Sequence, residues 1–493
     1  MWKWYNPQIA LFTAEGEFQP NPAYLDDVSE EEVDGKTQVT YTINEDAEYN
    51  DGTPIDWKTF EHTWKYNNGE NDELNVSSTD GYVLIESVEA GENDKEAVVT
   101  FSQPFAWWEG LFNYLVPTMV DTPEKFNEGW LGETPNEWGA GPYKVERSDF
   151  NRQTVTFVPN EKWWGEDPKL DKFTYRQLEP QAAINAFEAG EIDATGAATK
   201  DRLATVRGMG DSADIRTAMI PANYLITLNS DAPLLEDDTV REAIMTGIDR
   251  EQLATIRFNG LDYSEDLPGS FAQFATQGGY NDNFGEILEY DQDKAKELLD
   301  EAGWTEGADG VREKDGEKLS PRYVLLGDDP QTRAGASALQ AMMRDIGVDM
   351  TIDERPVSEF ANISAQRDFD ILEMGFRSSD PYGVAYFDQM YASDSELNKS
   401  GTGSEELDEK IAELQKIGDG DEQIEAANEL EKEFLALHGI MPTFNGPDIV
   451  ATTPGLANFG AYGFADVPVE NIGWENEYQP VARGHPGHTK NPL

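Results

Sequence analysis

The sequence predicts an α/β protein built as two or three lobes. The chain has 493 residues, which is long for one hydrophobic core because domains usually contain about 100–200 residues. Strand-like and helical segments alternate between residues 323 and 374, the order that produces βαβ units and a mixed or parallel sheet. Hydrophobic residues make up 38% of the chain and aromatic residues 11%, which is enough for packed cores and too much for a disordered chain.

The N-terminal third is expected to contain strands and an amphipathic helix. Trp57, Phe60 and Trp64 recur at the i, i+3, i+7 spacing of a helix, and Asp56 is suited to cap its N-terminus. A second, aromatic helix is expected in the segment AWWEGLFNYL, which follows Pro104. Strands are predicted over residues 37–45, 97–103 and 154–158.

Helices and strands alternate through the rest of the chain. In the helix predicted over 291–302, Ala295, Leu298 and Leu299 form an apolar face, and Gly303 stands where a C-terminal cap is needed. The other predicted helices cover residues 181–189, 238–248, 332–346, 405–417 and 421–437. The other predicted strands cover residues 224–229, 323–326, 348–352 and 370–374.

The charge of the chain is strongly acidic. Lys and Arg number 37 and Asp and Glu number 96, so the formal net charge is −59. A nucleic-acid-binding protein needs a basic face to neutralise phosphates, and none is visible here. An anionic membrane surface would repel the chain. The acidity favours a well-solvated surface, as on a secreted or salt-exposed protein.

Cysteine and histidine usage argues against metal and thiol chemistry. The chain has no cysteine, which excludes disulfides, thiol catalysis and thiolate metal sites. His485 and His488 lie in a Gly/Pro-rich tail and are interpreted as solvated residues rather than metal ligands. No HExxH, P-loop or GxSxG motif is present. We therefore predict no metal, no cofactor and no catalytic residue.

Hydropathy predicts no membrane-spanning segment in this sequence. No stretch approaches the ~18–20 apolar residues of a transmembrane helix. The opening residues, MWKWYNPQIALF, lack the basic and then apolar pattern of a signal peptide. We expect that a leader, and some residues of the mature protein, precede this sequence.

Seven segments carry distinctive combinations of residues in a defined order. They are YNDGTPIDWKTFEHTW at 49–64, GAGPYKV at 139–145, NEKWWGEDPKLDKFTYR at 160–176, AINAFEAGEIDA at 183–194, LEDDTVREAIMTGIDREQL at 235–253, YDQDKAKELLDEAGW at 290–304 and MMRDIGVDM at 342–350. Most of these positions are interpreted as scaffold; Gly139, Gly141 and Pro142, for example, set a backbone reversal. The segments therefore indicate a fold rather than a ligand.

In this order the segments resemble the family 5, or peptide-and-nickel-type, extracellular solute-binding proteins, and most of all their actinobacterial oligopeptide-binding members. The resemblance implies a two-lobed clamp of the periplasmic-binding-protein type (type II, cluster C), with an extra subdomain on the first lobe. It further implies a protein that is not an enzyme. Such a protein captures peptides between its lobes and delivers them to the permease and ATPase subunits of an ABC importer.

Two other functions stay open. The same scaffold would suit a non-peptide solute, such as a nickel chelate, a glycan or an anionic small molecule. A glycoside hydrolase is the remote alternative; it rests only on the many Asp, Glu and Trp residues and requires two carboxylates about 5–9.5 Å apart across a cleft.

The resemblance also sets the expected lobe boundaries. Lobe I is expected to comprise residues 1–24, 137–265 and 445–493, with a subdomain at 25–136. Lobe II is expected to comprise residues 266–444. The chain would then cross between the lobes near residues 265 and 444.

The resemblance places the ligand's α-amino partner, an acidic residue, in the loop after the strand that ends near Met374. That loop reads Gly-Phe-Arg-Ser-Ser-Asp-Pro-Tyr here and is about two residues shorter than the family pattern, with Phe376 in place of Trp. Aligned without a gap, the amine-binding position is Arg377; with a gap, Asp380 is the available carboxylate. Asp380 is the favoured amine partner, although a turn before Pro381 explains it equally well. Arg377 would instead attract a carboxylate.

Further residues are candidates for the walls of the ligand pocket. Phe376 and Tyr382 flank the loop, and Asn398 lies in an NKSG segment that resembles a family element near the cleft. The remaining candidates are Trp138, Tyr5 and Asn6.

The resemblance implies export to the outer face of the cell membrane with a lipid anchor, or a periplasmic location. The anchoring cysteine is not in this sequence. We expect a monomer that meets the membrane only through that anchor and that binds no nucleic acid.

Overall fold

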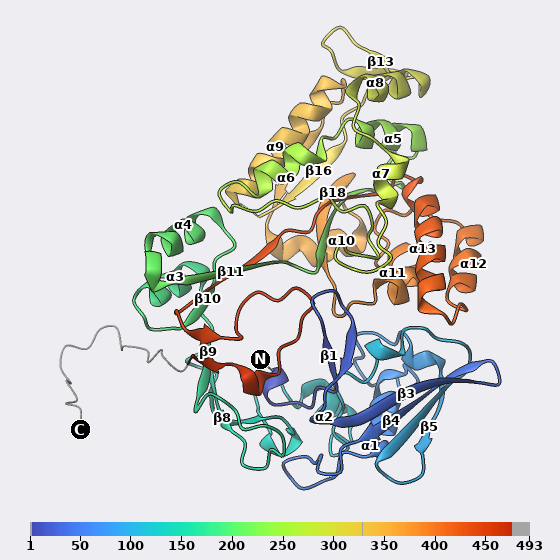
Figure 1. The fold of residues 1–493 in the computed structure, drawn as a ribbon. Helices are drawn as coiled ribbons and strands as arrows, with labels where there is room; N and C mark the ends of the chain where they lie inside the picture. Colours follow the sequence, from blue (N-terminus) through green and yellow to red (C-terminus); the bar gives the residue numbers. More distant parts are fainter. Residues whose placement is uncertain (1, 328, 476–493) are drawn as a thin grey trace. The chain divides into compact units, whose positions relative to one another are not determined.

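A computed structural model describes residues 2–327 and 329–475 of the chain, so His485 and His488 lie outside the described residues. The chain divides into two compact units: residues 1–219 with 447–493, and residues 220–446 (Figure 1). Among the described residues, no helix combines the length and the apolar character needed to cross a lipid bilayer.

The first unit is made mostly of small antiparallel sheets. Its strands are β1 (Ala10–Phe12), β2 (Phe18–Pro20), β3 (Leu25–Val33), β4 (Lys36–Ile43), β5 (Ile85–Ala90), β6 (Glu96–Phe101), β7 (Tyr143–Asp149), β8 (Thr154–Pro159), β9 (Phe173–Arg176), β10 (Ala194–Gly196), β11 (Asp214–Met219), β20 (Pro447–Thr452), β21 (Leu456–Ala457) and β22 (Gly473–Trp474). Its helices are α1 (Trp57–Asn67), α2 (Pro123–Glu128), α3 (Pro180–Glu188) and α4 (Lys200–Gly208).

A four-stranded sheet in the order β3-β4-β6-β5 supports one core of this unit. On β4, side chains alternate between buried and partly exposed, and Val39 and Tyr41 point into the core with Phe60 of α1. Asp56 caps α1 as predicted, because its side chain accepts the N–H of Lys58. The aromatic helix predicted after Pro104 is wrong: only a short 3-10 turn, Trp108–Gly110, forms there. Phe112, at φ +59°, is in the left-handed region and cannot continue a helix.

The second unit is built on one mixed sheet. Its strands are β12 (Ala222–Leu228), β13 (Thr305–Glu306), β14 (Arg312–Lys314), β15 (Glu317–Lys318), β16 (Arg322–Leu326), β17 (Thr351–Arg355), β18 (Ile371–Arg377) and β19 (Ile440–Phe444). Its helices are α5 (Asp238–Thr246), α6 (Arg250–Arg257), α7 (Asn283–Ile287), α8 (Gln292–Glu301), α9 (Pro330–Asp345), α10 (Phe360–Gln366), α11 (Phe387–Tyr391), α12 (Glu405–Leu414) and α13 (Gly420–Leu435).

The central sheet of this unit has the order β17-β16-β18-β12-β19. β16 runs parallel to β17 and β18, and β12 runs antiparallel to β18 and β19. Helices α9 and α10 lie on opposite faces of the sheet (Figure 1): Leu339 and Met343 of α9 join the larger core, and Ile363 of α10 joins a smaller one. This arrangement confirms the predicted α/β class. The candidate loop begins at the carboxyl end of β18.

The structure divides the chain between residues 219 and 220, whereas the lobe boundary expected near residue 265 stays a prediction. Strand β12 is hydrogen-bonded between β18 and β19, so it belongs to the second unit. The carboxylate of Glu265 also accepts the N–H groups of Asn445 (2.6 Å) and Gly446 (3.1 Å), which ties the segment around residue 265 to the last residues of that unit. Strand pairing and this carboxylate together explain why residues 220–265 belong with the second unit.

Candidate functional site

The candidate site is the loop that follows β18, over residues 378–385. Asp380 organises this loop as an Asx-type turn. Its Oδ1 accepts the Tyr382 N–H at 2.8 Å, and its Oδ2 accepts the hydroxyls of Ser379 at 3.0 Å and Tyr386 at 2.5 Å. The carboxylate is partly exposed, and its orientation is determined by these bonds. The structure therefore shows the turn-forming role that the sequence left open for Asp380.

A second segment, residues 268–282, packs against the candidate loop. The rings of Phe271 and Phe376 lie 5.1 Å apart, and Gln277 Nε2 donates to the carbonyl of Pro381 at 2.6 Å. Gly383 lies directly against the backbone of this segment, because a Cβ added there would stand 1.8 Å from the carbonyl oxygen of Ala272. The candidate loop is therefore supported along its length by a second segment of the same unit.

Arg377 occupies the exposed end of β18. Its backbone pairs with Ala222 of β12, but its guanidinium makes no hydrogen bond or ion pair with any other described residue. Arg377 is therefore a cation that forms no ion pair with a described residue, in a chain whose formal net charge is −59. It gives this end of the strand the capacity to bind an anionic group.

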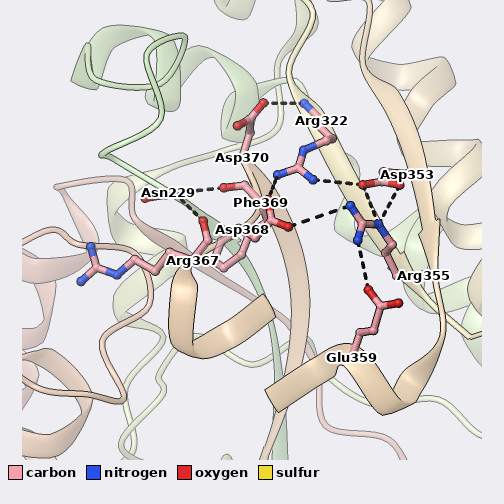
Figure 2. A network of polar contacts seen from close by, with 9 residues as sticks. All are labelled: Asn229, Arg322, Asp353, Arg355, Glu359, Arg367, Asp368, Phe369 and Asp370. Carbon is pink, nitrogen blue, oxygen red and sulfur yellow. Dashed lines mark hydrogen bonds and ion pairs between the residues drawn. The ribbon is translucent and has the colours of Figure 1, made fainter. Parts of the chain in front are cut away.

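Several other arginines of this unit form ion pairs with carboxylates, as Figure 2 shows for two of them. Arg322 bridges Asp353 (3.0 Å) and Asp368 (2.6 Å). Arg355 contacts Asp353 at 3.1 Å and Glu359 at 3.0 Å.

This ion-pair network holds the turn that precedes β18. The main-chain N–H of Arg322 donates to the Asp370 carboxylate at 2.7 Å, and Asn229 Nδ2 donates to the carbonyl of Phe369 at 2.9 Å (Figure 2). The start of β18 is therefore fixed by charged and polar contacts, whereas the side chain of Arg377 at its end is not.

Asn398 is an internal anchor rather than an exposed contact residue. It is 6% exposed, and its Nδ2 donates to the carbonyls of Tyr391 (3.2 Å), Ala392 (3.1 Å) and Thr402 (2.7 Å). Its Oδ1 accepts the Ser400 hydroxyl at 2.7 Å. Both ends of the amide are engaged within the protein, which agrees with the alternative interpretation of this segment as a turn.

The remaining predicted residues, Tyr5, Asn6 and Trp138, belong to the first unit. Tyr5 is fully buried, and its carbonyl accepts the N–H groups of Ala140 (3.0 Å) and Gly141 (2.9 Å). A Cβ at Gly141 would stand 2.8 Å from the carbonyl oxygen of Trp4, so the Gly-Ala-Gly-Pro motif allows a close approach of two backbones.

Trp138 is 8% exposed and packs edge to face on Trp130, with ring centroids 4.9 Å apart. Asn6 is partly exposed. In this structure Tyr5 and Trp138 are therefore core residues of the first unit.

Sequence reasoning missed Phe271, Gln277 and Tyr386, although all three contact the candidate loop. The segment around Phe271 has no periodic pattern, and its partners are far away in the sequence. No sequence pattern marks these three residues, and only a comparison of structures around the loop could have found them.

A partly exposed carboxylate lies on the central sheet of the second unit. Glu373 of β18 lines a small cavity together with Arg257, Tyr323, Thr332 and Phe444. Burial raises the pKa of Glu373 above its usual range, and the Arg257 guanidinium partly opposes that increase. Within residues 2–327 and 329–475 there is no group of three or more His, Asp or Glu side chains arranged to hold a metal ion.

We expect Glu373→Gln to increase stability at neutral pH. Because the folded pKa lies above the unfolded one, the ionised carboxylate costs stability at high pH, and this cost disappears as the pH falls to the unfolded pKa. Thermal midpoints measured from about pH 8 to about pH 4.5 should show the variant above the wild type at the upper end and a shrinking difference below it. A constant difference across this range would contradict the assignment.

A sequence model described as bacterial extracellular solute-binding proteins, family 5 Middle, matches residues 19–398. The chain belongs to this family of bacterial extracellular solute-binding proteins. This match confirms the resemblance carried by the seven sequence segments. The family is described as one of solute-binding proteins.

Individual relatives agree with this assignment. The oligopeptide-binding protein OppA of Mycobacterium tuberculosis is 36% identical over 448 residues, which cover 88% of this chain and 74% of the relative. The structure of the periplasmic EDTA-binding protein EppA is similar with a TM-score of 0.86 and 25% identity, covering 96% of this chain and 91% of that one. The oligopeptide-binding protein AppA of Bacillus subtilis, in complex with a nonapeptide, has a TM-score of 0.73 and 18% identity, with 96% and 94% coverage, and supports the fold alone.

Proposed function

We propose that this chain is the substrate-binding protein of an ABC importer and that it captures oligopeptides. The observation that carries the proposal is the 36% identity to an oligopeptide-binding protein across 88% of the chain. In this function no bond is broken. Affinity comes from main-chain hydrogen bonds along an extended ligand and from burial of its side chains.

In this proposal Asp380 binds the α-amino group of the peptide. Its orientation is already determined by Tyr382, Ser379 and Tyr386, so little conformational entropy is lost when the ammonium group binds. An ammonium–carboxylate hydrogen bond is among the stronger polar contacts in proteins. Phe376 and Tyr382 would form apolar walls beside it, and Asn398 would hold the backbone of its own segment rather than contact the ligand.

The first experiment is native mass spectrometry of the protein as purified from cells, followed by release and sequencing of any ligand. A heterogeneous set of short peptides supports the proposal. A single non-peptide mass contradicts it and favours the second candidate described below.

We expect Asp380→Asn to weaken the binding of a peptide with a free α-amino group by at least about tenfold, the loss expected for one charge-assisted hydrogen bond. The amide keeps an oxygen for the Tyr382 N–H, so the turn should persist. Isothermal titration calorimetry of a released peptide and of its N-acetylated form measures the effect.

The acetylated peptide should bind both proteins equally, and Asp394→Asn, at an exposed carboxylate in the same region, should leave both affinities unchanged. Equal affinity of the Asp380→Asn variant and the wild type for the free-amine peptide would remove Asp380 from the site.

A non-peptide anionic solute is the second candidate, and a specific observation favours it. The guanidinium of Arg377 has no partner among the described residues, and a protein of the same fold at 25% identity is described as binding EDTA, a polycarboxylate. In this case Arg377→Gln should abolish binding, whereas Asp380→Asn should not. A nickel chelate or a glycan would also appear as a single released mass.

The remaining features of the proposal follow from the family. The permease and ATPase subunits of an importer would be the partners of this chain, and a lipid anchor or the periplasm would keep it at the cell envelope. We further propose that the protein is a monomer, that it has no enzymatic activity and that residues 25–136 form a subdomain around β3, β4, β5 and β6. Sugar release from oligosaccharides would revive the glycosidase alternative.

A further inference from the structure

A carboxylate is buried in the second unit without an ion-pair partner among the described residues. Glu431 of α13 is 1% exposed. Its Oε1 accepts the main-chain N–H groups of Phe271 (2.9 Å) and Ala272 (3.1 Å) and the hydroxyl of Tyr391 (2.7 Å). Its Oε2 accepts Asn283 Nδ2 at 2.6 Å. The donors are all neutral, so the negative charge is stabilised by dipoles alone.

A buried charge of this kind is expensive unless its hydrogen bonds are complete. The side chain of a serine, threonine or glutamine could accept hydrogen bonds from the same turn, and burying a neutral side chain costs less desolvation free energy than burying a charged one. The carboxylate at this position holds two successive N–H groups with one oxygen, which defines the direction of the Phe271–Ala272 backbone. Hydrogen bonds to an ionised acceptor are stronger than neutral ones, so this turn is held more rigidly than the surrounding loop.

The segment 268–282, which contains this turn, supports the candidate loop through three separate contacts. Phe271 packs its ring on Phe376, and Gln277 donates to the carbonyl of Pro381. The carbonyl of Ala272, the residue whose N–H donates to Glu431, lies where only glycine is accommodated at position 383. Each of these contacts would be lost if the segment moved by about 3 Å, the length of a hydrogen bond.

We propose that Glu431 is a positioning residue for ligand binding, which acts by holding the 270–272 turn against the loop that carries Asp380. The ligand does not touch Glu431. The carboxylate determines where Phe271, and through it Phe376, stand beside the α-amino position. This inference rests on the proposed function for its binding consequence, but its structural part is independent of which ligand binds.

The test combines local hydrogen exchange with binding. In Glu431→Ala the amide proton of Phe271 loses its acceptor and should exchange at least about tenfold faster than in the wild type, whereas the amide of Ala272 keeps the Ser270 hydroxyl as an acceptor and should accelerate less. The amides of Tyr382 and Ala385, in the candidate loop, should also exchange faster. The affinity of the folded variant for a free-amine peptide should fall by about tenfold.

Matched variants separate positioning from general destabilisation. Glu431→Gln retains one oxygen for the two N–H groups and should give an intermediate result. Glu433→Gln, on the same helix but exposed and paired with Lys410, should behave as wild type. If Glu431→Ala does not fold, Gln277→Ala tests the link directly: exchange should accelerate at Tyr382 and Ala385 but not at Phe271.

Each result decides the question. Faster exchange at Phe271 with unchanged exchange in the candidate loop and unchanged affinity would show a purely structural carboxylate and overturn the inference. Equal exchange at Tyr382 in Gln277→Ala and the wild type would do the same. A wild-type protein that binds no peptide would contradict the proposed function, whereas the exchange measurements would still test the positioning role.

Discussion

Gly383→Ala is expected to lower the free energy of unfolding by about 2–4 kcal/mol, as overpacking against a fixed backbone does. The new Cβ would lie 1.8 Å from the carbonyl oxygen of Ala272 and 2.8 Å from its carbonyl carbon. Both atoms are backbone, so no side chain can rotate away. Either the candidate loop or the 270–272 turn must shift, and ligand affinity should fall with stability.

Urea denaturation measures the stability, and calorimetric titration measures the affinity. Gly335→Ala is the matched control, because it lies inside α9 with no atom within 4 Å of the added Cβ. There alanine should be neutral or stabilising by about 0.5–1 kcal/mol, from its helix propensity. If Gly383→Ala were as stable as the control, the two segments would not be in contact as the structure has them.

Arg241→Met is expected to be the most destabilising single change, at about 3–5 kcal/mol, because it leaves buried polar groups without partners. Arg241 is 5% exposed. Its guanidinium donates to the carbonyls of Leu235 (2.8 Å), Glu236 (3.0 Å) and Leu437 (2.9 Å) and to the carboxylate of Asp238 (3.0 Å). The side chain thereby links the start of α5 to the segment after α13.

Methionine has a comparable length and keeps the apolar contacts, so the loss reports mainly on the hydrogen bonds. Arg241→Lys retains the positive charge, but an ammonium group does not present several donors in one plane as a guanidinium does. This variant should therefore lose most of the same stability. Arg333→Met removes an exposed arginine that pairs with Glu354, and should cost less than about 1 kcal/mol. A loss of that small size for Arg241→Met would show that water replaces the guanidinium at little cost.

Arg241 also illustrates how the sequence segments relate to physical roles. It lies in the segment 235–253, where its residue type supported a family assignment but not a function. The structure shows why an arginine is required there: no other side chain offers several donors in a plane to carbonyls from two directions. Tyr5 and Trp138 show the opposite case. Both are aromatic residues near a recognisable motif that were expected in the ligand site, and both are buried in the core.

The helices were predicted well where local signals are strong. Asp291 caps α8 and Asp419 caps α13 by accepting N–H groups of the first turn, and the apolar residues recur on one face of each helix. The predicted strand at 348–352 begins instead at Thr351, because the N–H of Val348 donates to the Met343 carbonyl at the end of α9 and the N–H of Asp349 donates to the Leu319 carbonyl. Such shifts are expected, since strand limits depend on the partner strand.

The sequence by itself determined the α/β class, most helices and the family, because helix caps, apolar periodicity and ordered motifs are interactions between near neighbours. Only the tertiary structure decided what surrounds the candidate loop. Glu431 and Phe271 are 160 positions apart, and Gln277 and Pro381 are 104 apart. Contacts over such separations depend on how the sheet and α13 pack, and no local pattern records them. The same reason explains the boundary at residue 219, which is set by strand β12 pairing with strands that follow much later in the chain.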